Sequence, residues 1–311
     1  MSAGMIERGS VQEGGGVSEP LVRKRRLGAF TLYALDGGRQ RLDGGAMFGV
    51  VPKPLWEKRI AADARNRIPL ALRCLLLETP DALVLVDTGA GNKDATKFRD
   101  IYGIENASVT GQASQLEDAL AAAGYEPADV DVVIDSHLHF DHAGGNTRLT
   151  ADGQVALSFP RAKYVAQQGE FDYAHWHNER VQASYLPDNF DPVQRAGRLQ
   201  LVEGEVEVVP GVRVLPTPGH TPHHTSIVVR SEDETACFLA DLVPTAAHLP
   251  LAWIMGYDVE PLVTLETKRR LLRQAREENW LLVFEHDPAV AWGRLHAEPD
   301  RPQLAVLNEQ A

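Results

Sequence analysis

The sequence predicts an α/β protein in which two mixed sheets lie between outer helices. The prediction rests first on strands and helices that interleave along the chain, because short apolar runs are separated by segments of helical periodicity. It rests second on polar residues that directly follow several apolar runs, which is how a rigid sheet presents a site from its edge. The composition agrees, since 44% of residues are hydrophobic and 24% are charged, as in an ordinary globular protein.

Five segments are rich in apolar and β-branched residues and predict strands. They are residues 30–35, 71–77, 82–87, 132–134 and 201–214. The second and third are joined across Thr79-Pro80-Asp81, which suits a hairpin turn, and the last turns at Pro210-Gly211.

Two helices are predicted, over residues 114–123 and from 261 to about 279. The first begins with Ser114 and Glu117 in capping-box spacing and ends at Gly124. The second begins at a proline, a residue that is favourable in the first turn of a helix.

The N-terminal segment, residues 1–25, is predicted to be a disordered tail, and residues 26–311 to form one domain. The first 22 residues are rich in Gly, Ser and Glu and lack the continuous apolar segment of a signal peptide. No apolar run reaches the roughly 18 residues that span a bilayer, so we expect no membrane partner. Cys74 and Cys237 both lie in apolar strand runs, which favours two buried thiols and a cytoplasmic location.

Residues 136–142 place four metal-binding side chains within six positions: His137, His139, Asp141 and His142. A helical zinc pair spaces its imidazoles four residues apart, so this spacing is not a helical pair. The preceding strand would deliver His137 and His139 to one side, because alternate residues of a strand share a face. The loop would then bring Asp141 and His142 to a second nearby point, so two metal ions fit this segment better than one.

Three more candidate ligands lie downstream, each after an apolar run. His220 follows the strand that ends near Val214, Asp241 follows Leu239-Ala240, and His286 follows residues 281–284. No G-x-S-x-G motif is present, so a serine nucleophile of that kind is not expected.

With these motifs in this order, the chain resembles the metallo-β-lactamase-fold hydrolases over roughly residues 28–296. The resemblance implies that the two sheets and the outer helices form an αββα sandwich. The elements that carry the resemblance are residues 85–89 (Leu-Val-Asp-Thr-Gly), the H-x-H-x-D-H segment, Gly219-His220-Thr221, Asp241, and residues 285–287 (Glu-His-Asp). The order of elements is most similar to the methyl parathion hydrolase and quorum-quenching lactonase branches of the family.

The resemblance implies a dinuclear centre with two divalent ions per chain, most often zinc, with manganese, cobalt or iron as alternatives. Its first metal would be held by His137, His139 and His220, and its second by Asp141, His142 and His286. Asp241 would bridge the two ions, and a hydroxide between them would be the nucleophile. Asp141 and Asp241 are therefore the predicted catalytic carboxylates. Asp87 and His224 match residues that orient the ligands from behind.

Two positions depart from the resembled pattern. Lactonases of this fold commonly place a tyrosine three residues after the bridging aspartate, where this chain has Pro244. Tyr257 or His248 could take that role from the following loop. His223 stands where the family has glycine, and it is either a surface residue or a donor beside His220.

Two apolar loops, residues 46–52 and 248–257, are predicted to line the substrate pocket. An oligomer contact, such as a homodimer interface, or an ordinary covered loop is the alternative for the second segment. The pocket residues predicted from the two loops are Met47, Phe48, His248, Leu249, Trp253 and Tyr257.

These features predict a metal-dependent hydrolase that acts on a neutral, hydrophobic ester, lactone or phosphotriester. The net charge of -12, from 31 basic and 43 acidic residues, opposes binding to nucleic acid. One alternative is an oxidoreductase similar to the persulfide dioxygenases, which use one iron in this fold. The other is a metal-binding protein without catalytic activity. The sequence leaves the physiological substrate, the metal identity and the oligomeric state open.

Overall fold

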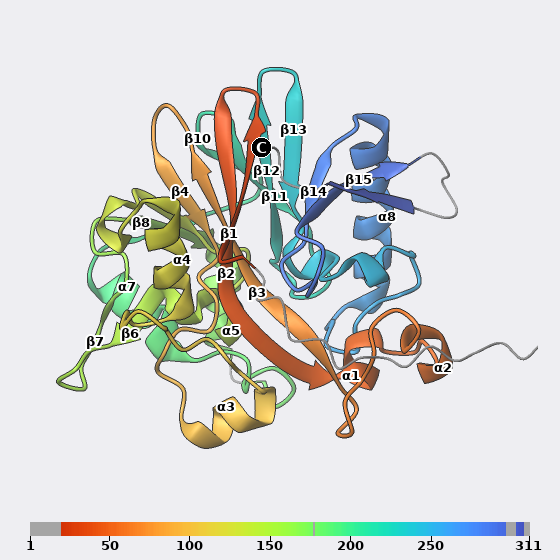
Figure 1. Ribbon diagram of the computed structural model, residues 1–311, viewed down its shortest axis with the longest axis horizontal. Helices are drawn as coiled ribbons and strands as arrows, with labels where there is room; N and C mark the ends of the chain where they lie inside the picture. The colour runs from red at the N-terminus through yellow and green to blue at the C-terminus, as the bar shows by residue number, and fades with distance from the viewer. Residues whose placement is uncertain (1–19, 177, 297–302, 308–311) are drawn as a thin grey trace, which may run out of the picture.

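The computed structural model describes residues 20–176, 178–296 and 303–307 and contains two large sheets packed face to face (Figure 1). The first sheet has the order β1-β2-β3-β4-β5-β8-β9 and the second β10-β11-β12-β13-β14-β15-β16. The strands of the first sheet are β1 (Val22–Leu27), β2 (Phe30–Asp43), β3 (Arg67–Glu78), β4 (Leu83–Val86), β5 (Val132–Ile134), β8 (Lys163–Gln167) and β9 (Leu199–Val202). Those of the second are β10 (Val206–Val209), β11 (Val212–Pro216), β12 (Thr225–Ser231), β13 (Glu234–Phe238), β14 (Leu281–Val283), β15 (Trp292–His296) and β16 (Gln303–Val306). A small separate hairpin pairs β6 (Thr147–Leu149) with β7 (Val155–Leu157).

Helices α4 and α8 cover the outer faces of the two sheets. Figure 1 shows α4 and α8 on opposite sides of the paired sheets. The helices are α1 (Gly44–Phe48), α2 (Lys53–Trp56), α3 (Thr96–Tyr102), α4 (Gln115–Ala123), α5 (Phe140–Ala143), α6 (Gln168–Ala174), α7 (Asp191–Arg195) and α8 (Pro261–Glu277). No helix within the described ranges is both long enough and apolar enough to cross a bilayer.

Three apolar clusters hold the four layers together. Between the sheets, side chains such as Leu75 and Val84 pack against Ile227 and Phe238 of the facing sheet. A second cluster joins the first sheet to Leu116 and Leu120 of α4, and a third joins the second sheet to Leu271 and Leu272 of α8. Because α4 and α8 each bury one apolar face against one sheet, the predicted αββα sandwich is confirmed.

Each sheet contains a parallel strand pair whose carboxyl ends lead into the candidate site. In the first sheet β4 pairs in parallel with β5, and in the second β13 pairs in parallel with β14. Parallel strands end at the same edge, so the residues that follow them meet there. Asp87 and His137 follow the first pair, and Asp241 and His286 follow the second.

Some local expectations differ from the structure. β1 lies partly within the segment predicted as a tail, because it pairs along its length with β2, whereas residues 1–19 lie outside the described residues. Residues 201–214 do not form one hairpin, since β9 joins the first sheet and only β10 and β11 make the turn at Pro210-Gly211. The capping box of α4 is absent, since the Ser114 side chain makes no capping hydrogen bond and Glu117 accepts from the Ala113 backbone N–H at 3.1 Å instead. Gly124 ends α4 in the left-handed conformation as predicted, with φ 92°.

Candidate metal centre and cavity

The H-x-H-x-D-H segment leaves the first sheet at the end of β5 and enters the short helix α5. His139 is the residue before the helix, while Asp141 and His142 lie inside it. The strand end and the helix therefore present ligands in two directions, as the spacing predicted. His137 and His142 are fully buried, so neither imidazole is exposed to bulk water.

His137, His139 and His220 form the first group of candidate ligands. One ring nitrogen from each lies within 4.8 Å of the others. Nδ1 of His139 and Nε2 of His220 are 3.1 Å apart. Nε2 of His137 is buried without a hydrogen-bond partner. A buried imidazole nitrogen with no partner is unfavourable unless something else binds it, and a metal ion fits that requirement.

Asp141, His142 and His286 form the second group. The Nε2 atoms of His142 and His286 are 3.2 Å apart. The carboxylate of Asp141 lies 3.9 Å from His142 Nε2 and 3.8 Å from His286 Nε2. Two imidazole nitrogens and a carboxylate oxygen are ligands that suit zinc.

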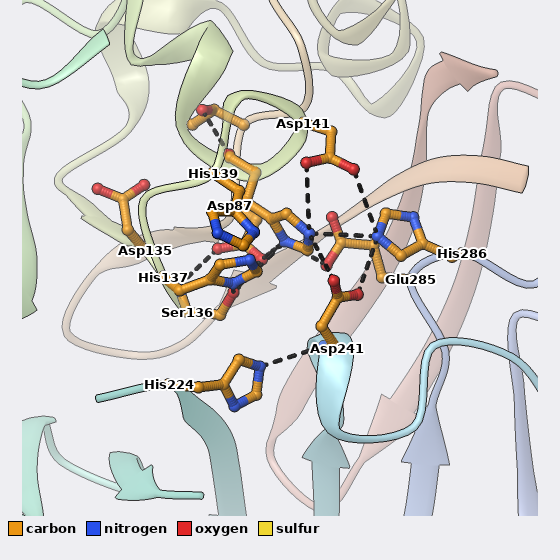
Figure 2. A network of polar contacts seen from close by, with 12 residues as sticks. Asp87, Asp135, Ser136, His137, His139, Asp141, His224, Asp241, Glu285 and His286 are labelled. Carbon is orange, nitrogen blue, oxygen red and sulfur yellow. Dashed lines mark hydrogen bonds and ion pairs between the residues drawn. The ribbon is translucent and has the colours of Figure 1, made fainter. Parts of the chain in front are cut away.

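Asp241 lies between the two groups (Figure 2). Its Oδ2 atom is 3.0 Å from Nε2 of His220, and its Oδ1 atom is 3.0 Å from Nε2 of His286. Each oxygen of one carboxylate therefore faces a different group, which is the arrangement that a bridging ligand needs.

The charges of the site favour an added cation. Burial alone would raise the pKa of Asp241, but His220, His286 and His142 lower that pKa well below its ordinary value. Burial lowers the pKa of His137 well below its usual range, which leaves a neutral ring with a free lone pair. Burial would also lower the pKa of His286, yet Asp241 and Glu285 raise it to about 9. The carboxylates thus attract positive charge that either protons or metal cations can supply.

The ring nitrogens that face away from the site are held by other groups. Nδ1 of His142 lies 3.0 Å from a carboxylate oxygen of Asp87 and 3.0 Å from one of Glu285. Nδ1 of His220 lies 3.0 Å from Asp258, and Nδ1 of His286 is 2.8 Å from the carbonyl oxygen of Ala71. Contacts of this kind fix the orientation of a metal-binding imidazole.

The two residues predicted to support the ligands from behind both contact the site. Asp87 accepts hydrogen bonds from the backbone N–H and the hydroxyl of Ser136, each at 2.7 Å. His224 accepts a hydrogen bond from the backbone N–H of Asp241 at 3.1 Å, and its other nitrogen donates to the carbonyl of Thr217. Burial lowers the pKa of His224 to about 3, so the ring stays neutral and keeps both contacts.

Several supporting residues were not predicted from the sequence. Gln40 of β2 donates from its amide nitrogen to Asp141 at 2.5 Å, and Asp258 and Glu285 hold His220 and His142. Glu285 directly precedes the candidate ligand His286 in the Glu-His-Asp segment, so its position in the sequence could have indicated its role. Gln40 and Asp258 lie in no recognisable motif, and only the tertiary structure brings them to the site.

A cavity of about 170 Å³ opens beside the candidate ligands. His139, Asp141, His220, Asp241 and His286 form part of its lining. The rest of the wall is mainly apolar and aromatic, with one guanidinium and one hydroxymethyl group. These further residues are Leu42, Met47, Leu70, Tyr102, Phe140, Arg180, Val181, Ser184, Met255, Gly256 and Tyr257.

Of the six predicted pocket residues, Met47 and Tyr257 line the cavity and the other four do not. Phe48 is fully buried between the rings of His248 and Trp56, with ring centroids 4.4 and 5.3 Å away, and Trp253 packs against its edge. Leu249 belongs to the apolar cluster beneath α8. These side chains support the wall from behind, so their assignment to the pocket surface is corrected.

A buried lysine binds the backbone of the segment between Asp241 and Tyr257 and holds it against the protein. Nζ of Lys268 donates to the carbonyl oxygens of His248, Pro250 and Trp253, the last two at 2.9 Å. His248 in turn contacts the carbonyl of Met47 at 2.8 Å and the hydroxyl of Thr245 at 2.8 Å. Both ring nitrogens of His248 therefore bind other protein groups, so His248 does not reach the cavity, whereas Tyr257 does. His223 is exposed, and its ring lies against Gly169 rather than among the ligands.

Comparisons with known proteins agree with this geometry. A family model described as the metallo-beta-lactamase superfamily matches residues 69–286. The N-acyl homoserine lactonase AiiA of Bacillus thuringiensis subsp. kurstaki is 32% identical over 270 residues, which cover 82% of this chain and 92% of that protein. The structure of a probable metal-dependent hydrolase from Staphylococcus aureus has a TM-score of 0.82 at 29% identity and covers 92% of this chain and 100% of its own. An N-acyl homoserine lactone hydrolase with its product N-hexanoyl-L-homoserine bound at the catalytic metal centre has a TM-score of 0.61 at 27% identity, covering 86% and 95%.

Proposed function

Because the chain belongs to the metallo-beta-lactamase superfamily and is a metal-dependent hydrolase, we propose that it hydrolyses a neutral, hydrophobic lactone with two divalent metal ions. The observation that carries the proposal is the cavity, which has Asp141, Asp241 and His286 in its lining and a mainly apolar wall. Pockets built in this way bind hydrophobic small molecules and orient them with a few polar groups. The lactonase relatives make an N-acyl homoserine lactone the first substrate to test, with aryl esters and phosphotriesters as the other candidates.

Two ions rather than one are proposed because of Asp241. Its oxygens each lie 3.0 Å from a histidine of a different group, so a single ion would leave one group unused. The imidazole and carboxylate donors make zinc the first metal to test, followed by manganese, cobalt and iron.

Bound there, two divalent ions would supply a hydroxide nucleophile at neutral pH and polarise the lactone carbonyl. Ring opening would join the hydroxide oxygen to the carbonyl carbon and break the ring carbon–oxygen bond. The hydroxide proton would pass to the leaving oxygen, so that the products are a carboxylate and an alcohol. Tyr257 is the proposed hydrogen-bond donor to the carbonyl oxygen or the leaving oxygen of the substrate. It lines the cavity, and burial raises its pKa to about 12. Its hydroxyl therefore keeps its proton at neutral pH.

The proposal also places the protein in the cytoplasm with a small molecule as its partner. Both cysteines are buried as free thiols, which suits a reducing compartment. The net charge of -12 disfavours RNA and DNA as substrates.

The direct test combines metal analysis with a substrate panel. We expect close to two metal ions per purified chain, loss of activity after treatment with a strong chelator, and recovery when zinc is restored. The panel should contain N-acyl homoserine lactones, aliphatic lactones, aryl esters, phosphotriesters, β-lactams and RNA. A single iron with oxygen consumption on a persulfide would replace the proposal with the oxidoreductase alternative, and efficient turnover of RNA would overturn the substrate class.

A further inference from the structure

Glu170, on α6, is a buried carboxylate with contacts to three separate segments. Its side chain is only 1% exposed. One oxygen accepts from the backbone N–H of Leu138 at 3.2 Å and from the hydroxyl of Tyr185 at 2.8 Å. The other accepts from the hydroxyl of Thr221 at 2.6 Å. Sequence reasoning assigned no role to this residue.

The three donors all adjoin the first group of candidate ligands. Leu138 lies between His137 and His139 in the chain, and Thr221 directly follows His220. The ring of Tyr185 packs edge-on against the ring of His139, with centroids 4.7 Å apart. Glu170 therefore contacts the neighbour of every ligand in this group.

The contacts also cross between the two sheets. Leu138 follows β5 of the first sheet, whereas Thr221 lies between β11 and β12 of the second. The ligands of the first group come from these two loops, and each loop could otherwise shift relative to the other. A carboxylate that accepts from both loops limits that movement, because displacing either loop would leave a buried donor unpaired.

The second group is supported by other residues. His142 is held by Asp87 and Glu285, and His286 by the carbonyl of Ala71. Gln40 donates to Asp141. The hydroxyl of Ser136 lies near a ring nitrogen of both His137 and His142, so this one contact is shared by the two groups. The hydrogen bonds of Glu170 go only to donors that adjoin the first group.

We propose that Glu170 is the positioning residue of the first metal site. It preorganises the site by holding the His137–His139 loop and the His220 loop at fixed positions relative to each other. The inference rests on the proposed dinuclear function. It adds that the first metal ion depends on a supporting residue that the second does not share. Partners that orient metal ligands typically change metal affinity by about 10- to 100-fold when they are removed, and that loss is expected at the first site alone.

The test uses Glu170→Gln and Glu170→Ala in the full chain, with Asp172→Asn as the matched control. Asp172 is an exposed carboxylate on the same helix whose side chain contacts Gln168. Cobalt(II) titration followed by absorption spectroscopy would report each binding step independently of activity. For Glu170→Ala we expect one step to weaken by about 10- to 100-fold and the other to stay unchanged. Glu170→Gln should weaken the same step less, because its amide oxygen still accepts from Leu138 and Tyr185.

Two backgrounds identify which site is affected. In the His286→Ala variant only the first group is complete, and there Glu170→Gln should lower the affinity for the one ion that still binds. In His139→Ala only the second group is complete, and there Glu170→Gln should leave affinity unchanged. Thr221→Val removes one of the three contacts and should weaken the first site without any change at Glu170, which covers the case that Glu170→Ala does not fold.

Equal weakening of both binding steps, or a lower melting temperature with both affinities intact, would overturn the positioning role. A wild-type protein that binds only one ion would instead refute the dinuclear proposal. The two failures are distinguishable because the second appears before any substitution at Glu170 is made.

Discussion

The metal centre and the cavity wall lie side by side but are built differently. In the centre, the polar side chains project from strand ends, and most of the histidines are held on the far side by a further polar contact. In the wall, Met47 and Tyr257 face the cavity while their neighbours Phe48 and Trp253 pack behind them. The comparison teaches that residues in one apolar loop divide between substrate surface and support, whereas the ligands act as one set. Substitutions should therefore affect chemistry in the centre and stability behind the wall.

The largest effect is expected in the centre, from Asp241→Ala. Both oxygens of this carboxylate contact ligand histidines, so its loss disrupts both groups at once. We expect activity to fall by more than about 100-fold, because even partners of ligands cost 10- to 100-fold, and metal content should fall with it. His223→Ala is the control, since His223 is exposed away from the ligands. If His223→Ala were the more damaging change, the ligand assignment would be wrong.

Behind the wall, Phe48→Ala should reduce stability rather than catalysis. Removing a buried ring that stacks between His248 and Trp56 leaves a cavity, and such changes cost about 3–5 kcal/mol in unfolding free energy. Chemical denaturation measures the loss, and the Michaelis constant for a lactone should change little in the folded fraction. Val50→Ala is the matched control, because Val50 is 92% exposed. An altered Michaelis constant with unchanged stability would return Phe48 to the substrate surface.

On the wall itself, Tyr257→Phe should reduce kcat/KM without changing metal content or stability. The loss of one hydrogen bond of about 0.5–1.5 kcal/mol corresponds to roughly twofold to tenfold. Burial raises the pKa of Tyr257 to about 12, so the hydroxyl stays protonated below that pH and is lost as a donor only above it. The ratio of wild-type to variant rates should therefore be constant from pH 6 to about pH 10. A ratio that changes near neutral pH would contradict the donor role.

The smallest effect is expected at the two cysteines, which lie in the sheets outside both regions. Both are fully buried, and burial raises the pKa of Cys237 to about 12. A thiol-specific reagent should therefore leave the native enzyme active and react fully only after denaturation. Cys74→Ser and Cys237→Ser should preserve the rate per metal-loaded chain. A collapse of that rate would indicate cysteine chemistry.

The same contrast explains which features the sequence could predict. The predicted ligands His137, His139 and His142 share one short segment, and their spacing is interpretable without knowing the fold. The α/β class also followed from local patterns, because strand and helix periodicities survive in the structure, whereas the αββα arrangement followed from the family resemblance. The side of a loop that faces the cavity leaves no such pattern.

Phe48 and Met47 are adjacent and both apolar, and only one lines the cavity. Their orientation depends on the stacking of His248 and on Lys268, whose partners are backbone carbonyls and so are invisible in the sequence. Gln40 was missed for a related reason, since it lies 101 residues before the Asp141 that it binds. Support residues of this type are defined by tertiary contacts alone.

The order of the two sheets along the chain has a consequence for how the enzyme could be divided. The first sheet is completed at Val202, and the second begins at Val206, so each is a continuous piece of sequence. A cut at Gly204, in the loop between them, would give two fragments that carry different subsets of the ligands. The N-terminal fragment would hold the H-x-H-x-D-H segment, and the C-terminal fragment His220, Asp241 and His286. Activity would then be a property of fragment complementation, regained only when both pieces associate and share their metals.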